Sequence, residues 1–343
     1  MYKNILNSID DYSDKKKVSQ QFHKFMVGEV SFSKAIELQS CANLLQFVSD
    51  KEFEKHKLWR MITCKDSFCP MCMWRKSRRD MMKIGTVMKW LKQEHSKEFI
   101  MLTLTYKRVS ADELSSTIDK FQNAFNRMFN RKKIKDLSHG YVKKLEVTYD
   151  KNKKVTSEMY KQRKEFYDRK GILIGMDNPN FDTYNVHYHV LIAVNKSYFT
   201  DTKVYMNRDE WLKFWRRAMK DDLITQVDVR KVRPSSEKEG SEVGGAWEIA
   251  KYTAKSADYL VNEDVFFVFR SALYRRRRIV YSGLFREGAE KYDEGELDCL
   301  LEKDETDYEY LLKFAWHFSN EVYNKSEVRL LTDEEKEELK ELK

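Results

Sequence analysis

Two histidines separated by one residue, His187 and His189, are the side chains of this 343-residue sequence that point most directly to chemistry. They lie in the run 184–194, which is rich in Tyr, Val, Ile and Leu and follows a turn-forming stretch at 177–182, so we expect a strand. Because side chains along a strand repeat every two residues, both imidazoles point to one face of it. Such a pair supplies half of a metal site, although a hydrogen-bonded histidine in a half-buried strand is the more common arrangement.

A carboxylate that could join the histidines stands in a second predicted strand, 141–149. Glu146 is flanked there by the apolar residues Leu145 and Val147. If Glu146 faces the functional side of the sheet, it becomes a third metal ligand, whereas in an ordinary alternation it faces solvent. The pattern favours neither interpretation over the other.

Three cysteines form a compact group, Cys64-x4-Cys69-Pro-x-Cys72. This spacing is typical of a knuckle that wraps a tetrahedral zinc ion, and thiols in a cytosolic chain are more often free or metal-bound than paired in disulfides. The fourth ligand is Cys41 or His56, and Cys41 is favoured because soft thiolates suit zinc and all-thiolate structural sites are common. The simpler interpretation is a set of thiols without metal.

A third group of chemically active side chains follows the clearest loop of the sequence, 233–245. In the segment after it, the helical spacing i, i+4, i+7, i+11 predicts one face that carries Glu248, Tyr252, Lys255 and Tyr259. The phenol of Tyr252 therefore has a carboxylate one turn before it and an amine one turn after it.

The composition indicates the kind of partner and the cellular compartment of the protein. Lys and Arg (64) exceed Asp and Glu (55), which gives a net charge of +9 and an isoelectric point near 9.0, and a polyanionic partner is plausible. The sequence has neither an apolar run long enough for a membrane span nor a signal peptide, so we expect a cytoplasmic protein. Two basic runs are candidates for phosphate contact, and a solvated helix start is the ordinary explanation of the first. They are Arg75, Lys76, Arg78 and Arg79 beside Trp74, and Arg275, Arg276, Arg277 and Arg278.

The elements that must position these groups can be read in order along the chain. Residues 1–40 read as helical, and a helix follows the cysteine knuckle. Strand 99–106 carries Thr103 and Thr105 on one face, and two capping boxes, at Ser110 and at Asn207, open later helices. Residues 227–232 and 279–281 suggest further strands, so we expect a mixed α+β chain.

These motifs, in this order, resemble those of the rolling-circle plasmid replication initiators of the HUH endonuclease superfamily, in the single-tyrosine class typical of small Gram-positive plasmids. The resemblance covers roughly residues 35–285. The first family motif matches Leu102-Thr103-Leu104-Thr105, the second matches Asn185-Val186-His187-Tyr188-His189 with Val186 where Pro is common, and the third matches Glu248, Lys251, Tyr252, Lys255 and Asp258. The family's cysteine pattern matches Cys41, Cys64, Cys69 and Cys72, with Ala42 where a glycine is often found.

The resemblance implies an α+β fold in which a central antiparallel sheet is flanked by helices and is joined to an N-terminal cysteine zinc knuckle. On this basis we divide the chain into three parts. Residues 1–95 form a helical and zinc-knuckle region, residues 96–285 form the HUH nicking and joining domain, and residues 286–343 form a charged helical tail.

The resemblance also implies a metal-dependent, site-specific DNA endonuclease that nicks and joins strands. His187, His189 and Glu146 hold Mn2+ or Mg2+, since mixed nitrogen and oxygen ligation suits these ions, and the cysteines hold a structural Zn2+. Tyr252 attacks the scissile phosphate, forming a 5′-phosphotyrosyl link and a free 3′-hydroxyl primer, and Lys255 stabilises the developing charge. Glu248 activates the water of the terminating cleavage.

The implied partner is the plasmid origin, as duplex or hairpin and as single strand, together with a host helicase and DNA polymerase; a homodimer stays open. Thr103, Thr105, Lys251 and the two basic runs are the candidate DNA contacts. A single-tyrosine transposase shares the order of motifs but usually lacks the cysteine knuckle, and a relaxase usually places its tyrosine at the N-terminus. A non-catalytic zinc protein that binds single-stranded nucleic acid explains the charge and the cysteines but not the paired histidines.

Overall fold

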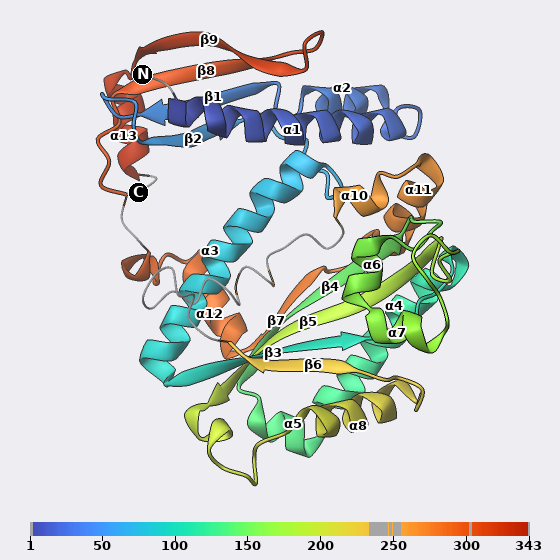
Figure 1. Ribbon diagram of the computed structural model, residues 1–343. Helices are drawn as coiled ribbons and strands as arrows, with labels where there is room; N and C mark the ends of the chain where they lie inside the picture. The colour runs from blue at the N-terminus through green and yellow to red at the C-terminus, as the bar shows by residue number, and fades with distance from the viewer. Residues whose placement is uncertain (1–2, 233–245, 247–248, 250–254, 302–303, 342–343) are drawn as a thin grey trace. The chain divides into compact units, whose positions relative to one another are not determined.

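The structure, a computed structural model, describes residues 3–232, 246, 249, 255–301 and 304–341 (Figure 1). The chain divides into two compact units. The first contains residues 1–76 and 301–343, and the second contains residues 77–300. Helix α3 (Pro70–His95) begins in the first unit and continues in the second.

The first unit is built around a four-stranded antiparallel sheet in the order β2-β1-β8-β9. Its strands are β1 (Leu44–Ser49), β2 (His56–Met61), β8 (Tyr310–His317) and β9 (Val322–Leu330). Its other helices are α1 (Lys3–Met26), α2 (Phe32–Ser40) and α13 (Asp333–Glu341). Because β1 pairs with β8, segments from the two ends of the sequence share one sheet, as Figure 1 shows in blue and red.

This arrangement differs from the predicted division into 1–95, 96–285 and 286–343. A charged helical tail was expected from residue 286 onward, but residues 310–330 form two strands. The main helices in this part of the chain are α12 (Leu284–Asp293) and α13. The physical reason is that β8 buries its apolar side chains, Leu311 among them, in a small core with Val48 of β1. Local patterns carry no information about such a partner far away in the sequence.

The second unit contains the predicted central sheet, and all of its strand pairs are antiparallel, in the order β6-β3-β5-β4-β7. The strands are β3 (Lys97–Thr105), β4 (Gly140–Asp150), β5 (Thr183–Asn195), β6 (Val227–Lys231) and β7 (Ile279–Gly283). Each lies within about two residues of its predicted position, because apolar and β-branched residues mark the strands clearly. The expected mixed α+β fold, with a sheet flanked by helices, is confirmed.

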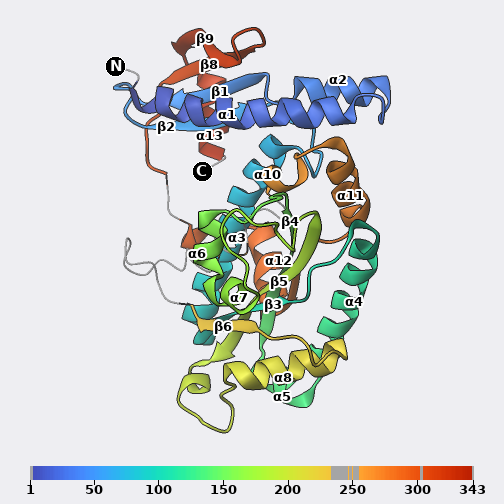
Figure 2. The same ribbon diagram turned by 45° about the vertical axis from the view of Figure 1, so that its right-hand side comes forward.

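Helices cover both faces of this sheet, as the two views in Figures 1 and 2 show. Helices α4 (Ala111–Phe129) and α8 (Arg208–Met219) lie on one face, where Phe121 contacts Tyr188 of β5. Helices α3 and α12 lie on the other face, where Phe285 belongs to an apolar cluster with Leu191 of β5. The shorter helices are α5 (Lys132–Leu137), α6 (Ser157–Gln162), α7 (Lys164–Arg169), α10 (Ser256–Tyr259), α11 (Glu263–Leu273), η1 (Lys196–Phe199) and η2 (Asp298–Leu300).

Both predicted capping boxes are present and fix where α4 and α8 begin. Glu113 accepts a hydrogen bond from the backbone N–H of Ser110 at 3.2 Å. Asn207 accepts from the backbone N–H of Glu210 at 2.9 Å, and Glu210 accepts in return from that of Asn207 at 3.2 Å. These contacts satisfy backbone donors that a helix start otherwise leaves without partners.

Candidate active site and cysteine cluster

The three central strands of the second unit bring the predicted active-site side chains to one face of the sheet. Glu146 of β4 lies directly opposite His187 of β5 in the strand register. On the other side of β5, Thr105 of β3 lies opposite His187 and Thr103 lies opposite His189. Directly paired residues of neighbouring strands point to the same face, so the carboxylate, both imidazoles and both hydroxyls share it.

Hydrogen bonds hold His189 between two of these neighbours. Its Nε2 lies 2.6 Å from Oε2 of Glu146, and its Nδ1 lies 3.2 Å from Oγ1 of Thr103. The ring planes of His187 and His189 are inclined by only 26°, with their centroids 6.4 Å apart. The carboxylate therefore lies on the same face of the sheet as the histidines and contacts one of them, His189.

The protonation states of this group follow from its burial and its contacts. Burial alone raises the pKa of Glu146, but its hydrogen bond with His189 and the nearby charge of Lys144 outweigh this and lower the pKa to about 2. Burial lowers the pKa of His187 to about 4, because a low-polarity environment disfavours the charged imidazole. At neutral pH the first is a carboxylate and the second a neutral imidazole, which are the forms that bind metal ions.

These donors fit a divalent ion that accepts mixed nitrogen and oxygen ligands. With Glu146 ionised, the 2.6 Å contact is a hydrogen bond from Nε2–H of His189, so that proton must leave before the nitrogen can act as a ligand. The side chains of His189 and Glu146 are 15% and 16% exposed, which leaves the face partly open. A partly open set of donors suits an ion that must also contact a substrate.

Two further charged residues lie near this face: Lys144, which belongs to none of the sequence motifs, and Asp258, the last residue of the third motif. Lys144 lies opposite His189 in the register, is 1% exposed, and lowers the pKa of Glu146 through its charge. Asp258 of α10 has a pKa raised to about 6, chiefly by burial and in part by the charge of Glu146. In the sequence, Lys144 looks like one more lysine of a basic protein, because burial decides its importance and burial depends on the fold.

The predicted nucleophile segment is described only in part, because Glu248, Lys251 and Tyr252 lie outside the described residues, as does the predicted loop 233–245. Ala246 and Ile249 are fully buried in the apolar cluster that includes Leu191, on the same face of the sheet as His189. On the other side of the segment, α10 packs against β4. Described residues that precede and follow Tyr252 in the sequence therefore contact the sheet that carries the histidines.

The expectation of one continuous helical face through Tyr259 is wrong. Lys255 has an extended backbone (φ −72°, ψ 139°) and stands at the N-cap of α10, so a helix does not continue through it. Tyr259 is fully buried and its ring contacts Phe266 and Phe269. The helical spacing did not reveal that α10 begins after Lys255, because Lys255 and Ser256 are acceptable both inside a helix and at its start.

The two basic runs differ in how their side chains are used. In the second run, Arg276 donates to the carboxylate of Asp119 and, at 3.0 Å, to the hydroxyl of Ser115, so it ties the end of α11 to α4. Arg275 and Arg277 are exposed. In the first run, Arg78 and Arg79 are exposed on α3. Their assignment to DNA contact stays a prediction.

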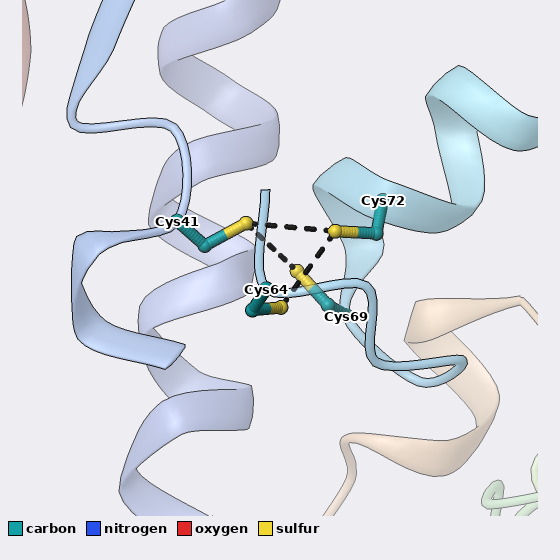
Figure 3. A group of neighbouring side chains, drawn as sticks. All are labelled: Cys41, Cys64, Cys69 and Cys72. Atoms are coloured by element: carbon teal, nitrogen blue, oxygen red, sulfur yellow. Dashed lines mark hydrogen bonds between the residues drawn. The ribbon is translucent and has the colours of Figure 1, made fainter. Parts of the chain in front are cut away.

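The four cysteines gather into one cluster in the first unit (Figure 3). Their Sγ atoms all lie within 4.8 Å of one another, and three pairs are 3.6 Å apart: Cys41 with Cys69, Cys41 with Cys72, and Cys64 with Cys72. Four thiolates at 2.3 Å from a tetrahedral zinc ion would be about 3.8 Å apart. The cluster can therefore hold a zinc ion, with three of the four cysteines buried.

The choice of Cys41 over His56 as the fourth member is supported by this geometry. Cys41 is fully buried in the cluster, whereas His56 belongs to β2 and has its ring centroid 6.1 Å from that of Phe47. Ala42 adopts a left-handed backbone with φ 57°, a conformation that glycine adopts at lower cost than other residues. Hydrogen bonds among the four thiols lower the pKa of Cys69 and raise that of Cys41, so the four groups titrate together rather than independently.

The fold and both sites can now be compared with known proteins. The chain matches the family described as replication protein over residues 55–324, and it belongs to that family. A protein named "Protein rep" from Staphylococcus aureus is 39% identical over 256 residues, which cover 75% of this chain and 97% of that protein. "Protein rep" from Lentilactobacillus hilgardii is 32% identical, covering 75% of each chain, and that from Streptococcus pneumoniae is 30% identical, covering 73% of this chain and 69% of that protein. No solved structure matches the chain.

Family membership confirms the resemblance to rolling-circle plasmid replication initiators that the motifs indicate. It places the chain among replication proteins rather than transposases. Among the residues that the structure describes, no helix is long and apolar enough to cross a membrane.

Proposed function

We propose that the protein initiates rolling-circle replication of a plasmid by nicking one DNA strand at the origin and later rejoining it. The observation that carries this proposal is the meeting of His187, His189 and Glu146 on one sheet face in a chain of the replication protein family. Tyr252 supplies the nucleophile, and the described residues before it, Ala246 and Ile249, pack against this sheet. The substrate is the plasmid origin, bound as duplex or hairpin and cut as a single strand.

The reaction is a transesterification at phosphorus. The phenol oxygen of Tyr252 forms a bond to the scissile phosphorus while the bond from phosphorus to the 3′-oxygen breaks. The leaving oxygen takes up a proton and becomes the free 3′-hydroxyl from which a host polymerase extends, and the 5′-phosphate stays on the protein. A phenol with a pKa near 10 is mostly protonated at neutral pH, so the ammonium group of Lys255 supports the reaction by stabilising the negative charge that develops.

The residues of the sheet face prepare the phosphate for attack. Glu146 and His187 are in their metal-binding forms at neutral pH, and Thr103 fixes the ring of His189 through Nδ1. A divalent ion, Mn2+ or Mg2+, held by these three side chains supplies Lewis-acid polarisation of the scissile phosphate. Glu248 is the general base that activates water in the terminating cleavage.

The DNA path uses Thr103, Thr105, Lys251 and the exposed arginines of the two basic runs. The zinc-binding cluster stabilises the first unit, whose basic helix start at Arg75 contributes to origin binding. A host helicase and DNA polymerase act on the nicked product, and a homodimer is a further proposal.

The test is nicking of single-stranded oligonucleotides that carry a candidate origin, in the presence of manganese. We expect the parent to form a covalent adduct that migrates more slowly in a denaturing gel, Tyr252→Phe to lose it, and Glu248→Ala to keep it while losing the terminating hydrolysis. Tyr205→Phe is the matched control, because Tyr205 is an exposed tyrosine outside this face. DNA binding without any metal-dependent adduct would contradict the proposal and favour a non-catalytic nucleic-acid-binding protein.

A further inference from the structure

Helix α1 of the first unit carries a buried row of polar side chains that none of the sequence motifs includes. Lys16, Ser19 and His23 are spaced i, i+3 and i+7, so they lie on one face of the helix. Lys16 and Ser19 are fully buried and His23 is 8% exposed. Buried polar groups are costly unless they have partners, so this face must meet a polar environment.

That environment is the cysteine cluster. The ammonium group of Lys16 donates to the backbone carbonyl of Cys41 and, at 2.8 Å, to Oδ1 of Asn43. These contacts place a positive charge, removed from water, next to the first cysteine of the cluster. A lysine is rarely found fully buried without such compensation.

The next turn of the helix contacts a second cysteine. The hydroxyl of Ser19 lies 3.4 Å from Sγ of Cys69, within hydrogen-bond distance for sulfur, and 3.2 Å from Nε2 of His23. His23 therefore orients the hydroxyl that faces the sulfur. Helix α1 (residues 3–26) lies outside residues 55–324, the span over which the chain matches its family. The family match therefore does not cover the contacts of α1 with the cysteines.

A zinc ion with four thiolate ligands has a net charge of −2, and burying that charge is unfavourable unless cations and hydrogen bonds compensate it. We propose that α1 supplies this compensation: Lys16 and Ser19 are positioning residues that stabilise the zinc-loaded cluster, and the loaded cluster in turn holds α1 in place. The proposal goes beyond nicking, and it rests on the cluster holding zinc. Because the two equilibria are linked, zinc binding and docking of α1 strengthen each other by the same factor.

The first experiment measures the zinc affinity of the full-length protein by competition with a chromogenic chelator. We expect Lys16→Met, which replaces the aliphatic part of the side chain and removes its charged end, to weaken zinc binding by about 10- to 100-fold, and Ser19→Ala to weaken it less. The matched controls lie on the same helix. Lys24→Met changes an exposed lysine, and Ser13→Ala changes a buried serine whose hydroxyl donates to the backbone of Ile9 at 3.0 Å.

The second experiment needs no variant, so it stays informative if Lys16→Met fails to fold. Hydrogen exchange of α1 amides is followed in the parent with zinc bound and after the chelator has removed it. We expect exchange in α1 to become faster without zinc, while exchange in β5 of the second unit stays the same. Unchanged exchange in α1, or a zinc affinity of Lys16→Met equal to that of Lys24→Met, would overturn the proposal. A parent protein without bound zinc would also refute it, and this outcome leaves the nicking proposal untouched.

Discussion

The cysteine cluster of the first unit and the histidine face of the second differ in what completes them. Three of the four cysteines are buried, and the sulfur atoms already lie at distances close to those of a tetrahedral site. On the histidine face, a hydrogen bond joins His189 to Glu146, and both side chains remain partly exposed. A closed set of four soft ligands suits a structural ion, whereas a partly open set of nitrogen and oxygen ligands suits an ion that shares its coordination with a substrate.

The histidine face should respond most strongly to loss of one ligand. We expect His189→Ala to reduce manganese-dependent nicking by on the order of 1,000-fold or more, because several kcal/mol of charge stabilisation at the phosphate are lost. Nicking rates on an excess of single-stranded oligonucleotide measure the effect. The control is His317→Ala, an exposed histidine at the end of β8. Zinc content should be equal in both variants, and a His189→Ala protein that nicks at the parent's rate would remove the histidine from the mechanism.

The cysteine cluster should give the opposite pattern. We expect Cys69→Ser to lose bound zinc and to lower the temperature at which the first unit unfolds, because a structural zinc ion contributes directly to folding. Nicking of a short single-stranded oligonucleotide should stay within about threefold of the parent, since the attacking segment and the histidine face belong to the second unit.

The matched variant is Cys299→Ser, which changes an exposed cysteine outside the cluster. Zinc content by elemental analysis and unfolding by calorimetry separate the two variants. If Cys69→Ser lost nicking as completely as His189→Ala, the two sites would not have separate structural and catalytic roles.

The same comparison shows what sequence reasoning can and cannot reach. The cysteine spacing predicted three members of the cluster, because ligand spacing is a local constraint on the chain, and the preference of zinc for thiolates favoured Cys41 as the fourth. The strands around His187 were equally clear, because period-two apolar patterns are local as well. The sequence did not reveal the two buried lysines that place a positive charge near these sites. Lys144 lies on the histidine face and Lys16 lies beside the cysteines, and both matter because the fold buries them.

Two further predictions were wrong where local patterns did not determine the structure. Strand β8 looks like part of a charged tail until β1, more than 250 residues earlier in the chain, provides its partner. Lys255 has an extended backbone where its spacing with Tyr252 predicted a helix, since residues of this type are acceptable both inside a helix and at its start. Long-range pairing and burial decide the first case, whereas the extended backbone of Lys255 is a local feature that residue type does not specify.

The two sites should also differ in how acid affects them, and His187 gives a quantitative test. In the folded protein its pKa is lowered to about 4, against 6.5 for an ordinary histidine. As the pH falls below about 6.5, His187 takes up a proton in the unfolded chain but stays neutral in the folded protein. The free energy of unfolding therefore decreases until the pH reaches about 4. Between pH 7 and pH 5 this costs roughly 2 kcal/mol. The carboxylate of Glu146, with its pKa of about 2, acts in a separate window: its contribution is present above about pH 4.5 and is lost toward pH 2.

Urea unfolding at pH 7 and pH 5, without added manganese or magnesium, measures this loss. We expect His187→Gln to lose less stability than the parent over this interval, by roughly the same 2 kcal/mol, because glutamine has no proton to bind. His317→Gln, at an exposed position, should follow the parent. Acid also releases zinc from thiolates, but that loss is common to all three proteins and cancels in the difference. An equal loss in His187→Gln and the parent would mean that burial does not hold His187 neutral. The histidine face would then not present a neutral imidazole that is ready to bind a metal ion.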